Sequence, residues 1–514
     1  MPPRLTRRAT LALGGAAALA RPALAQDASR VLRFVPHANL TTLDPLWSSA
    51  LVSYCAASMI FDRLYGLDDA LVPQPQMVRG HELSDDGLQW RFTLREGLLW
   101  HDGTPVLAKD CVASIDRWAQ RDGFGLRLKA QMQEMRALDD RRFEIRLARP
   151  FPQMLFGLGA TACFMMPERT AATPASASIT DYTGSGPFVF REDEWVAGAR
   201  ALFERNPRYV SRPEPPQFWA GGRPVNFDRV EWHIMPDPAT AASALQTGEV
   251  DWVERPLADL LPVLRRQRSL KVEVLDPLGS WAEIRFNTAV PPFNNPKVGR
   301  ALLPVVKQAD FLQAFLGDQP EMMDTAAGIF LPGTPLANKA GMDILTGPRD
   351  LELARHLLRE SGYAGEPVVM LEATDLSNSA AFSPVARQLF EQVGLKVDYQ
   401  SMDWGTLVSR AQSAQGNWSC YPIAWAGLWI TNPAMHAHLY GTAPNPRMTA
   451  LRDAWFDAPD LPAQRAVAEK IQLQAFEEPP LLPLGRYFNA QAYSTRLSGF
   501  VKAPTATFWN LRKA

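Results

Sequence analysis

Apolar and polar residues alternate strictly along the segment that begins at Trp90. Trp90, Phe92 and Leu94 lie on one side of it, which is the pattern of a strand with one buried face. Asp102-Gly103 then supplies turn residues, and apolar residues recur at helical spacing over residues 112–118. The pattern predicts a strand, a turn and an amphipathic helix in direct succession.

The rest of the chain also alternates between strand and helix patterns. Strands are expected at 31–35, 143–147, 227–234, 250–252, 368–371, 395–399 and 482–487, and helices at 238–247, 348–362, 383–393 and 462–478. Asp237 and Pro238 suit the start of one helix, and Gly248 its end. Pro304 should kink or end another, because a proline inside a helix removes a backbone hydrogen bond. Strands that alternate with helices predict an α/β fold with largely parallel pairing.

Several short motifs follow one another in a characteristic order. The segment 94–118 reads LREGLLWHDGTPVLAKDCVASIDRW, with LDP upstream at 43–45 and GSGP and NPRY downstream at 184–187 and 206–209. This order resembles the extracellular solute-binding proteins, family 5, of peptide and nickel ABC importers, which include the oligopeptide- and dipeptide-binding proteins. The resemblance covers most of the chain after residue 25.

The resemblance implies an α/β, two-lobed periplasmic binding protein (type II, cluster C-like) with an additional small accessory domain. The expected parts are a signal peptide at 1–25, a first lobe made of 26–70, 183–278 and 485–514, an accessory domain at 71–182, and a second lobe at 279–484. The length of 514 residues agrees with several domains, since it is too long for one hydrophobic core. Crossovers between the lobes are natural hinges.

The N-terminus has the features of an export signal. Arginines at positions 4, 7 and 8 form a basic region, an apolar segment follows at 11–20, and the A-x-A sequence at 23–25 fits a cleavage site. Residues 6–11 resemble a twin-arginine export motif, but Thr10 stands where a bulky apolar residue is usual, so the general secretory route stays open. The cleavage site has no cysteine for a lipid anchor, and we expect a free periplasmic protein.

Charge and cysteine content narrow the classes of partner. Removal of residues 1–25 takes away four arginines and no acidic residue, which changes the net charge from −1 to −5. Without a basic run, this balance argues against nucleic acid as a partner. We expect a monomer whose partners are a small-molecule or peptide ligand and the membrane subunits of an ABC permease. The cysteines are far apart in sequence, so disulfides and four buried thiols are both open; they are Cys55, Cys111, Cys163 and Cys420.

Motifs of the common enzyme classes are missing from the sequence. The patterns G-x-S-x-G, S-x-x-K, H-E-x-x-H, C-x-x-C and Walker A do not occur. Residues 157–162 match G-x-G-x-x-A, but the nearby prolines and the lack of a surrounding βαβ unit argue against a dinucleotide site. His436 and His438 are the only close histidine pair, and they lack the further ligands that a metal site needs. We expect no cofactor and no metal.

Tryptophans of the expected second lobe are the first candidates for ligand contacts. The sequence WAGLW at 425–429 stands where the family has a loop that faces the cleft, so the resemblance implies that Trp425 and Trp429 line the ligand pocket. A place in the core is the alternative for either side chain. Trp281 and Asn287 lie near the crossing between lobes, and Asn287 could equally satisfy local backbone groups. Trp404 follows Asp403 in a loop.

Two further candidates lie near the C-terminus. Arg486 and Tyr487 stand where the family carries an aromatic run near the cleft. Arg486 would hold a carboxylate or form an ion pair at the surface.

The cleft loop departs from the family pattern at one position. By the resemblance, peptide binders use an aspartate of this loop to hold the ligand's α-ammonium, since a buried cation must be paired. Leu428 or a neighbour occupies that position here. Asp403 is a candidate substitute, although an acidic loop residue is usually solvated. A modified peptide, an opine-like compound or another amphipathic solute therefore fits better than a standard dipeptide.

These observations predict the periplasmic substrate-binding component of an ABC importer and no catalytic activity. The protein would capture a peptide-like or other small amphipathic solute between its lobes and deliver it to the permease. The first alternative is a periplasmic hydrolase or metal-dependent enzyme without a recognisable motif. The second is a binding protein that acts as a chemosensory or chaperone partner without transport.

Overall fold

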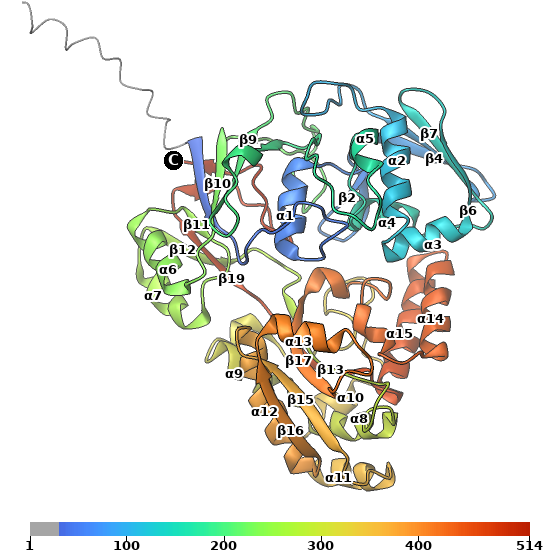
Figure 1. Ribbon diagram of the computed structural model, residues 1–514, viewed down its shortest axis with the longest axis vertical. Helices are drawn as coiled ribbons and strands as arrows, with labels where there is room; N and C mark the ends of the chain where they lie inside the picture. Colours follow the sequence, from blue (N-terminus) through green and yellow to red (C-terminus); the bar gives the residue numbers. More distant parts are fainter. Residues whose placement is uncertain (1–29) are drawn as a thin grey trace, which may run out of the picture.

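The computed structural model describes residues 30–514, so the predicted signal peptide lies outside the described part (Figure 1). An upper body holds the N-terminal half of the chain, and a lower body holds most of the C-terminal half. We call the lower body lobe II, and we divide the upper body into lobe I and the accessory domain. Within residues 30–514, no helix is long and apolar enough to cross a membrane.

Lobe I is built on a seven-stranded sheet with the order β12-β19-β11-β1-β10-β9-β8. Its strands are β1 (Val31–Val35), β8 (Phe188–Phe190), β9 (Arg200–Arg205), β10 (Arg229–His233), β11 (Trp252–Val253), β12 (Leu270–Val274) and β19 (Ala490–Ser494). The first strand pairs in parallel with β10 and β11, and the outer pairs are antiparallel. Phe34 on β1 contacts the rings of Trp232, Trp252 and Phe508, which form the core of this lobe.

Helices complete lobe I. They are α1 (Leu51–Ile60), α6 (Pro238–Thr247) and α7 (Leu261–Arg266). All ten residues of α1 are buried. The start and end of α6 are as predicted, because the Asp237 side chain accepts a hydrogen bond from the Thr240 N–H and Gly248 has a left-handed conformation, with φ of 81°. Short pairs also occur, β2 (Tyr65–Leu67) with β3 (Pro73–Pro75) and β20 (Leu497–Ser498) with β21 (Arg512–Lys513).

The accessory domain contains an antiparallel sheet with the order β4-β5-β7-β6. The elements are β4 (Val78–Leu83), β5 (Gln89–Leu94), α2 (Ala108–Trp118), α3 (Gly123–Gln131), β6 (Met132–Ala137), β7 (Arg142–Leu147), α4 (Met154–Ala160) and α5 (Glu168–Ala171). The predicted strand and helix are therefore confirmed as β5 and α2. Phe92 stacks on Phe143 of the neighbouring strand, with ring centroids 5.0 Å apart.

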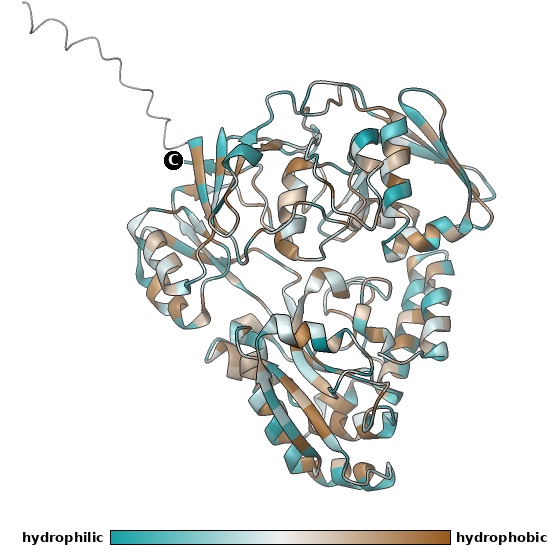
Figure 2. Ribbon diagram, in the orientation of Figure 1, coloured by the Kyte–Doolittle hydropathy of each residue, from teal (hydrophilic) through white to brown (hydrophobic). Residues whose placement is uncertain are grey.

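Lobe II is built on a six-stranded sheet with the order β14-β18-β13-β17-β15-β16. Its strands are β13 (Ser280–Phe286), β14 (Met323–Asp324), β15 (Pro367–Ala373), β16 (Lys396–Met402), β17 (Cys420–Ala426) and β18 (Leu481–Tyr487). The strand β13 is antiparallel to both neighbours, and β15 pairs in parallel with β16. The prediction of largely parallel pairing is therefore wrong, because antiparallel pairs outnumber parallel ones in the sheets of both lobes. Figure 2 shows mostly apolar residues along the central strands and polar residues on the outer helical turns.

Helices surround the sheet of lobe II. They are α8 (Pro296–Leu302), α9 (Gln308–Leu316), α10 (Asp343–Thr346), α11 (Leu351–Glu360), α12 (Ser377–Val393), α13 (Trp404–Ala411), α14 (Pro446–Asp457) and α15 (Leu461–Glu477). The chain leaves α8 just before Pro304, as predicted. The predicted start of α12 is wrong. This helix begins at Ser377 and contains Pro384, because its first turns bury Ser379 and Phe382 and packing there outweighs one missing hydrogen bond.

The lobes are joined by two short segments that lie side by side. One connects β12 to β13 through Gly279, and the other connects β18 to β19 through Phe488 and Asn489. A side chain at Gly279 would approach the Tyr487 carbonyl to 2.5 Å, and φ of 67° also favours glycine there. The predicted domain boundary after residue 484 falls inside β18, so we propose to place the return to lobe I after Tyr487.

The accessory domain also touches lobe II. The ring of Phe124 on α3 lies 5.3 Å from that of Phe456 on α14, and Arg127 forms ion pairs with Asp453 and Asp457 at 3.3 and 3.1 Å. Figure 1 shows α3 beside the upper ends of α14 and α15. The two bodies therefore meet at this contact as well as at the crossovers.

Candidate functional site

A cavity of about 780 Å³ lies between the lobes. Its lining residues from lobe I are His37, Ala38, Ser48, Ser49, Ala50, Leu51, Val52 and Arg255. The residues from lobe II come from β13, β17, α12, α13 and the segment after β17. Because side chains of both lobes form its walls, a molecule bound there would contact both.

Three tryptophans of lobe II form an aromatic wall. Trp404 is the first residue of α13, Trp425 lies near the end of β17, and Trp429 lies in a short helix, η7 (Gly427–Ile430). All three line the cavity and are half-buried. The ring of Trp429 also meets that of Tyr54 of α1 edge to face, with centroids 5.6 Å apart. Aromatic side chains therefore bridge the lobes beside the cavity.

A buried carboxylate lies behind this wall. Glu283 on β13 is fully buried, and it forms an ion pair with Nδ1 of His438 and accepts a hydrogen bond of 3.2 Å from the Trp425 indole. Burial alone would raise the pKa of Glu283, but the charge and hydrogen bond of His438 outweigh it, so the pKa lies below its usual value. The imidazole of His438, in the short helix η8 (Ala437–Tyr440), lies edge to face on Trp425, with centroids 4.9 Å apart, and lines the cavity.

Lobe I contributes a second histidine–carboxylate pair, similar to His438 and Glu283 of lobe II. The Nδ1 atom of His37 lies 2.7 Å from Oε2 of Glu254, and the side chains are only 13% and 6% exposed. Burial tends to raise the pKa of Glu254, but the charge and hydrogen bonds of His37 have the larger, opposite effect. The pKa of Glu254 therefore lies below its usual value. His37 lines the cavity, and Glu254 does not. In both lobes the imidazole faces the cavity and the carboxylate lies behind it.

Two arginines also line the cavity, Arg255 from lobe I and Arg285 from β13 of lobe II. Neither forms an ion pair within the described residues 30–514. Arg285 donates a hydrogen bond of 2.8 Å from Nη1 to the Tyr421 hydroxyl, and its guanidinium lies 5.3 Å from the centre of the Trp418 ring. These neighbours hold Arg285 in place without neutralising its charge.

Three predicted site residues lie outside the cavity lining. Trp281 is fully buried beneath His436, and its indole donates to the Gly328 carbonyl at 3.0 Å. Asn287 is fully buried and donates to the carbonyls of residues 414 and 418, which is the backbone role considered as its alternative. Arg486 pairs with Asp324 at 2.7 Å and donates to a backbone carbonyl.

Tyr487 does not line the cavity but hydrogen-bonds to a residue that does. It is buried, and its hydroxyl accepts a hydrogen bond of 3.3 Å from Asn378, which lines the cavity. The seven predicted residues therefore divide into three that line the cavity, one behind its wall and three engaged elsewhere in lobe II.

The cleft loop has no acidic residue at the position of the family's amine anchor, as its sequence indicates. Leu428 is fully buried, and Asp403 caps α13 by accepting from the Thr406 N–H at 2.9 Å. His436 is also buried, and its ring packs against Trp281 rather than beside His438 in the cavity. In the described part of the chain, no three His, Cys, Asp or Glu side chains gather as a metal site would require.

The sequence reasoning missed the charged residues of the site. Trp281, Glu283 and Arg285 alternate along β13 and share one face of the sheet, which is a visible period-two signal. Glu283 pairs with His438, which lies 155 positions away, and no local sequence pattern predicts such a distant pair. The four cysteines, left open before, are free and buried.

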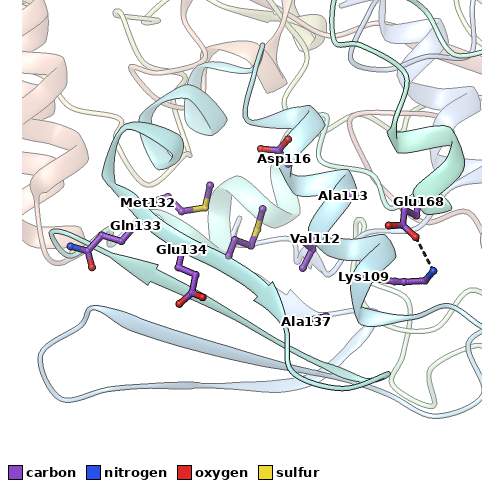
Figure 3. A pocket seen from close by; sticks show the side chains of 10 residues that line it. Lys109, Val112, Ala113, Asp116, Met132, Gln133, Glu134, Ala137 and Glu168 are labelled. Carbon is purple, nitrogen blue, oxygen red and sulfur yellow. Dashed lines mark ion pairs between the residues drawn. The ribbon is translucent and has the colours of Figure 1, made fainter.

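A second hollow of about 410 Å³ lies within the accessory domain, between α2 and β6 (Figure 3). Lys109, Val112 and Asp116 come from α2, and Met132, Gln133 and Glu134 come from β6. Lys109 forms an ion pair with Glu168 at 2.8 Å, and both side chains are more than half exposed. No residue of lobe II contributes to this groove.

The chain is similar to known binding proteins over nearly its whole length. The family model described as bacterial extracellular solute-binding proteins, family 5 Middle, matches residues 72–446. A protein of Sinorhizobium fredii (strain NBRC 101917 / NGR234), named probable peptide ABC transporter periplasmic-binding protein y4tO, is 36% identical over 520 residues and is covered to 98%, as is this chain. The glutathione-binding protein GsiB of Salmonella paratyphi A is 25% identical over 528 residues, again with 98% of each chain covered.

A solved structure shares the fold of this chain. The ABC transporter-associated periplasmic binding protein DppA from Helicobacter pylori, in complex with the peptide STSA, matches with a TM-score of 0.77 at 19% identity, over 94% of this chain and 98% of that one. This likeness confirms the predicted fold class. The chain belongs to family 5 of the bacterial extracellular solute-binding proteins.

Proposed function

We propose that this protein is the periplasmic substrate-binding component of an ABC importer that takes up peptide-like or other small amphipathic solutes. The observation that carries this proposal is the cavity of about 780 Å³ with walls from both lobes. Cavities of this size suit small ligands and commonly combine apolar walls with a few polar groups. A solute that contacts both lobes stabilises their closed arrangement, which is the form that a permease would recognise.

Trp404, Trp425 and Trp429 are the proposed ligand contacts, since their half-buried rings line the cavity. Flat aromatic faces accept varied apolar groups, as a solute class with variable side chains requires. The names of the relatives, a peptide transporter component and a glutathione-binding protein, support a peptide-like solute. Leu428 in the cleft loop favours a ligand whose recognition does not depend on a free amine.

The remaining parts of the proposal concern the cell. We propose that the chain is exported, with twin-arginine and general secretory routes both open, and that it works as a monomer beside the membrane subunits of an ABC permease. The motif at residues 6–11 supports the twin-arginine route.

Uptake and binding test the proposal together. Synthetic tripeptide mixtures are added to the purified exported protein, and thermal unfolding is followed. A bound solute should raise the melting temperature in proportion to the logarithm of its concentration. Cells that lack the gene should also lose uptake of that solute. Binding without any loss of uptake would favour a sensory or chaperone role over transport.

The histidine–carboxylate pairs are also compatible with a hydrolase, because hydrolases use such pairs to activate a nucleophile. Among residues 30–514, no serine, threonine or cysteine side chain hydrogen-bonds to the ring of His37 or His438. We therefore propose capture without chemistry. Solute recovered after long incubation should have its original mass, and a cleaved product would instead support a hydrolase.

A further inference from the structure

We propose that the captured solute carries a carboxylate, and that Arg255 of lobe I and Arg285 of lobe II bind this group from opposite sides of the cavity. The inference rests on the proposed function and specifies the chemical class of its solute. The basic residues that line the cavity are Arg255, Arg285, His37 and His438, and no Asp or Glu of residues 30–514 is among the lining residues.

Two buried acidic residues behind the cavity wall are already engaged. Glu254 pairs with His37, and the fully buried Glu283 pairs with His438 and also accepts from Trp425. Each carboxylate lies behind its imidazole, so a cationic group of a ligand would meet histidine and arginine first. A buried cation without a partner is strongly disfavoured. The same arrangement favours a ligand anion.

Arg285 has the geometry of a preorganised anion donor. Among residues 30–514, only its Nη1 has a hydrogen-bond partner, the Tyr421 hydroxyl at 2.8 Å. The rings of Trp418 and Tyr421 lie 5.3 and 5.7 Å from the guanidinium centre. A guanidinium has five N–H donors in a plane and binds carboxylates in a bidentate manner. Most of these donors remain for a ligand, and aromatic contacts limit the motion of the side chain.

Lobe I offers a cation and free backbone donors at its side of the cavity. Arg255 lines the cavity and forms no ion pair among residues 30–514. The first residues of α1 lie beside it in the lining, and Ala50 at the N-cap provides no side-chain acceptor for the amides of the first turn. The partial positive charge of a helix N-terminus adds to the attraction that Arg255 exerts.

The location of the two arginines links this specificity to closure. A carboxylate bound by both side chains contacts lobe I and lobe II at once, so its binding energy favours the arrangement in which the lobes are close. A solute with a blocked carboxylate would lose this effect.

The test uses one synthetic tripeptide mixture in three forms: unmodified, N-acetylated, and with a C-terminal amide. Each form is incubated with the purified exported protein, unbound peptide is removed by filtration, and retained peptide is quantified by mass spectrometry. We expect the N-acetylated form to be retained within about threefold of the unmodified one, and the amide to be retained at least tenfold less. Retention of the amide equal to that of the free acid would overturn the inference and leave the proposed function standing.

Variants of the two arginines test whether these side chains cause the preference for the free acid over the amide. Arg255→Gln and Arg285→Gln should each reduce the preference for the free acid over the amide at least fivefold. Arg285→Lys, which keeps a charge, should retain part of it. The control is Arg387→Gln on α12, where the arginine is half-exposed and paired with Glu391 outside the cavity. A preference that survives both glutamine variants would refute the role of the arginines. If no form is retained by the wild-type protein, the proposed peptide-like solute is wrong and the inference falls with it.

Discussion

The two hollows of this protein differ in how their charged groups are satisfied. In the accessory groove (Figure 3), Lys109 is paired with Glu168 at the surface, and all lining residues come from one domain. In the inter-lobe cavity, two arginines form no ion pair with any carboxylate of residues 30–514, and the imidazoles of two buried pairs face inward. The lysine of the groove is therefore already neutralised by a protein carboxylate, whereas the arginines of the cavity carry charge that a ligand would neutralise.

This difference indicates what distinguishes a binding site from a surface depression. An exposed ion pair contributes little to stability, since water and salt screen it. A cation held in a partly buried place without a partner loses solvation, and the fold retains it only at a cost. The unpaired arginines of the cavity are therefore better evidence for ligand binding than the size of either hollow.

The largest effect is expected for Trp425→Ala. The substitution removes an aromatic wall of the cavity and the indole that donates to Glu283, so the affinity for a captured solute should fall by about 3 kcal/mol, roughly 100-fold in Kd. Titration calorimetry measures the change. The control is Trp195→Ala in lobe I, which lies outside the cavity lining and should leave affinity unchanged. Equal affinity of Trp425→Ala and wild type would remove this loop from the site.

The variants Glu283→Gln and Glu168→Gln compare a buried ion pair with an exposed one. The amide weakens the interaction with His438, and unfolding free energy should fall by about 2 kcal/mol, the usual contribution of a hydrogen bond to a charged group. Glu168→Gln in the accessory groove should change it by less than about 0.5 kcal/mol. Denaturant titration of both variants gives the values. A larger loss in Glu168→Gln than in Glu283→Gln would show that the exposed pair stabilises the fold more than the buried one.

Stability should also respond to pH through His436, which lies behind the cavity. Burial lowers the pKa of His436 to about 4. As pH falls from about 6.5 towards 4, the unfolded chain takes up a proton that the folded state does not, so the folded state loses on the order of 1 kcal/mol per pH unit from this residue. The loss is absent above about pH 6.5.

The matched variants for this pH effect are His436→Phe and His356→Gln. The first keeps a ring against Trp281 and should flatten the fall in unfolding free energy between pH 6.5 and 5. The second changes an exposed histidine on α11 and should leave the slope as in wild type. If His436→Phe keeps the wild-type slope, His436 is not responsible for it.

The smallest effect is expected in the accessory groove. Gln133→Trp places a large side chain at the exposed edge of β6 and should change solute affinity by less than twofold, because no ligand contact is proposed there. The same titration used for Trp425→Ala measures it. A tenfold loss of affinity would show that the groove takes part in binding.

Local sequence patterns predicted fewer than half of the helices and strands, and they failed where packing decided. The alternation at β5 and the caps of α6 are local properties, and both were predicted correctly. The sequence pattern predicts a start of α12 at Ser383-Pro384, because the local proline rule gives no weight to the buried Phe382. The fold class came from the order of the motifs rather than from any single segment.

The site was predictable only in part. The WAGLW loop pointed to Trp425 and Trp429 because of its place in the family pattern. Trp281 lies on the same face of β13 as Arg285, but it is fully buried against His436, and a contact from a distant loop is invisible in the alternation. The pairing of His37 with Glu254 joins residues 217 positions apart, so only the folded chain brings them together.

Native mass spectrometry of the exported protein, purified without added ligand, tests capture in the inter-lobe cavity most directly. We expect the wild-type protein to carry an intact small solute with an acidic group, and Trp425→Ala purified in the same way to be largely empty. A solute retained equally by both proteins, or released as a cleaved product, would contradict capture at this site.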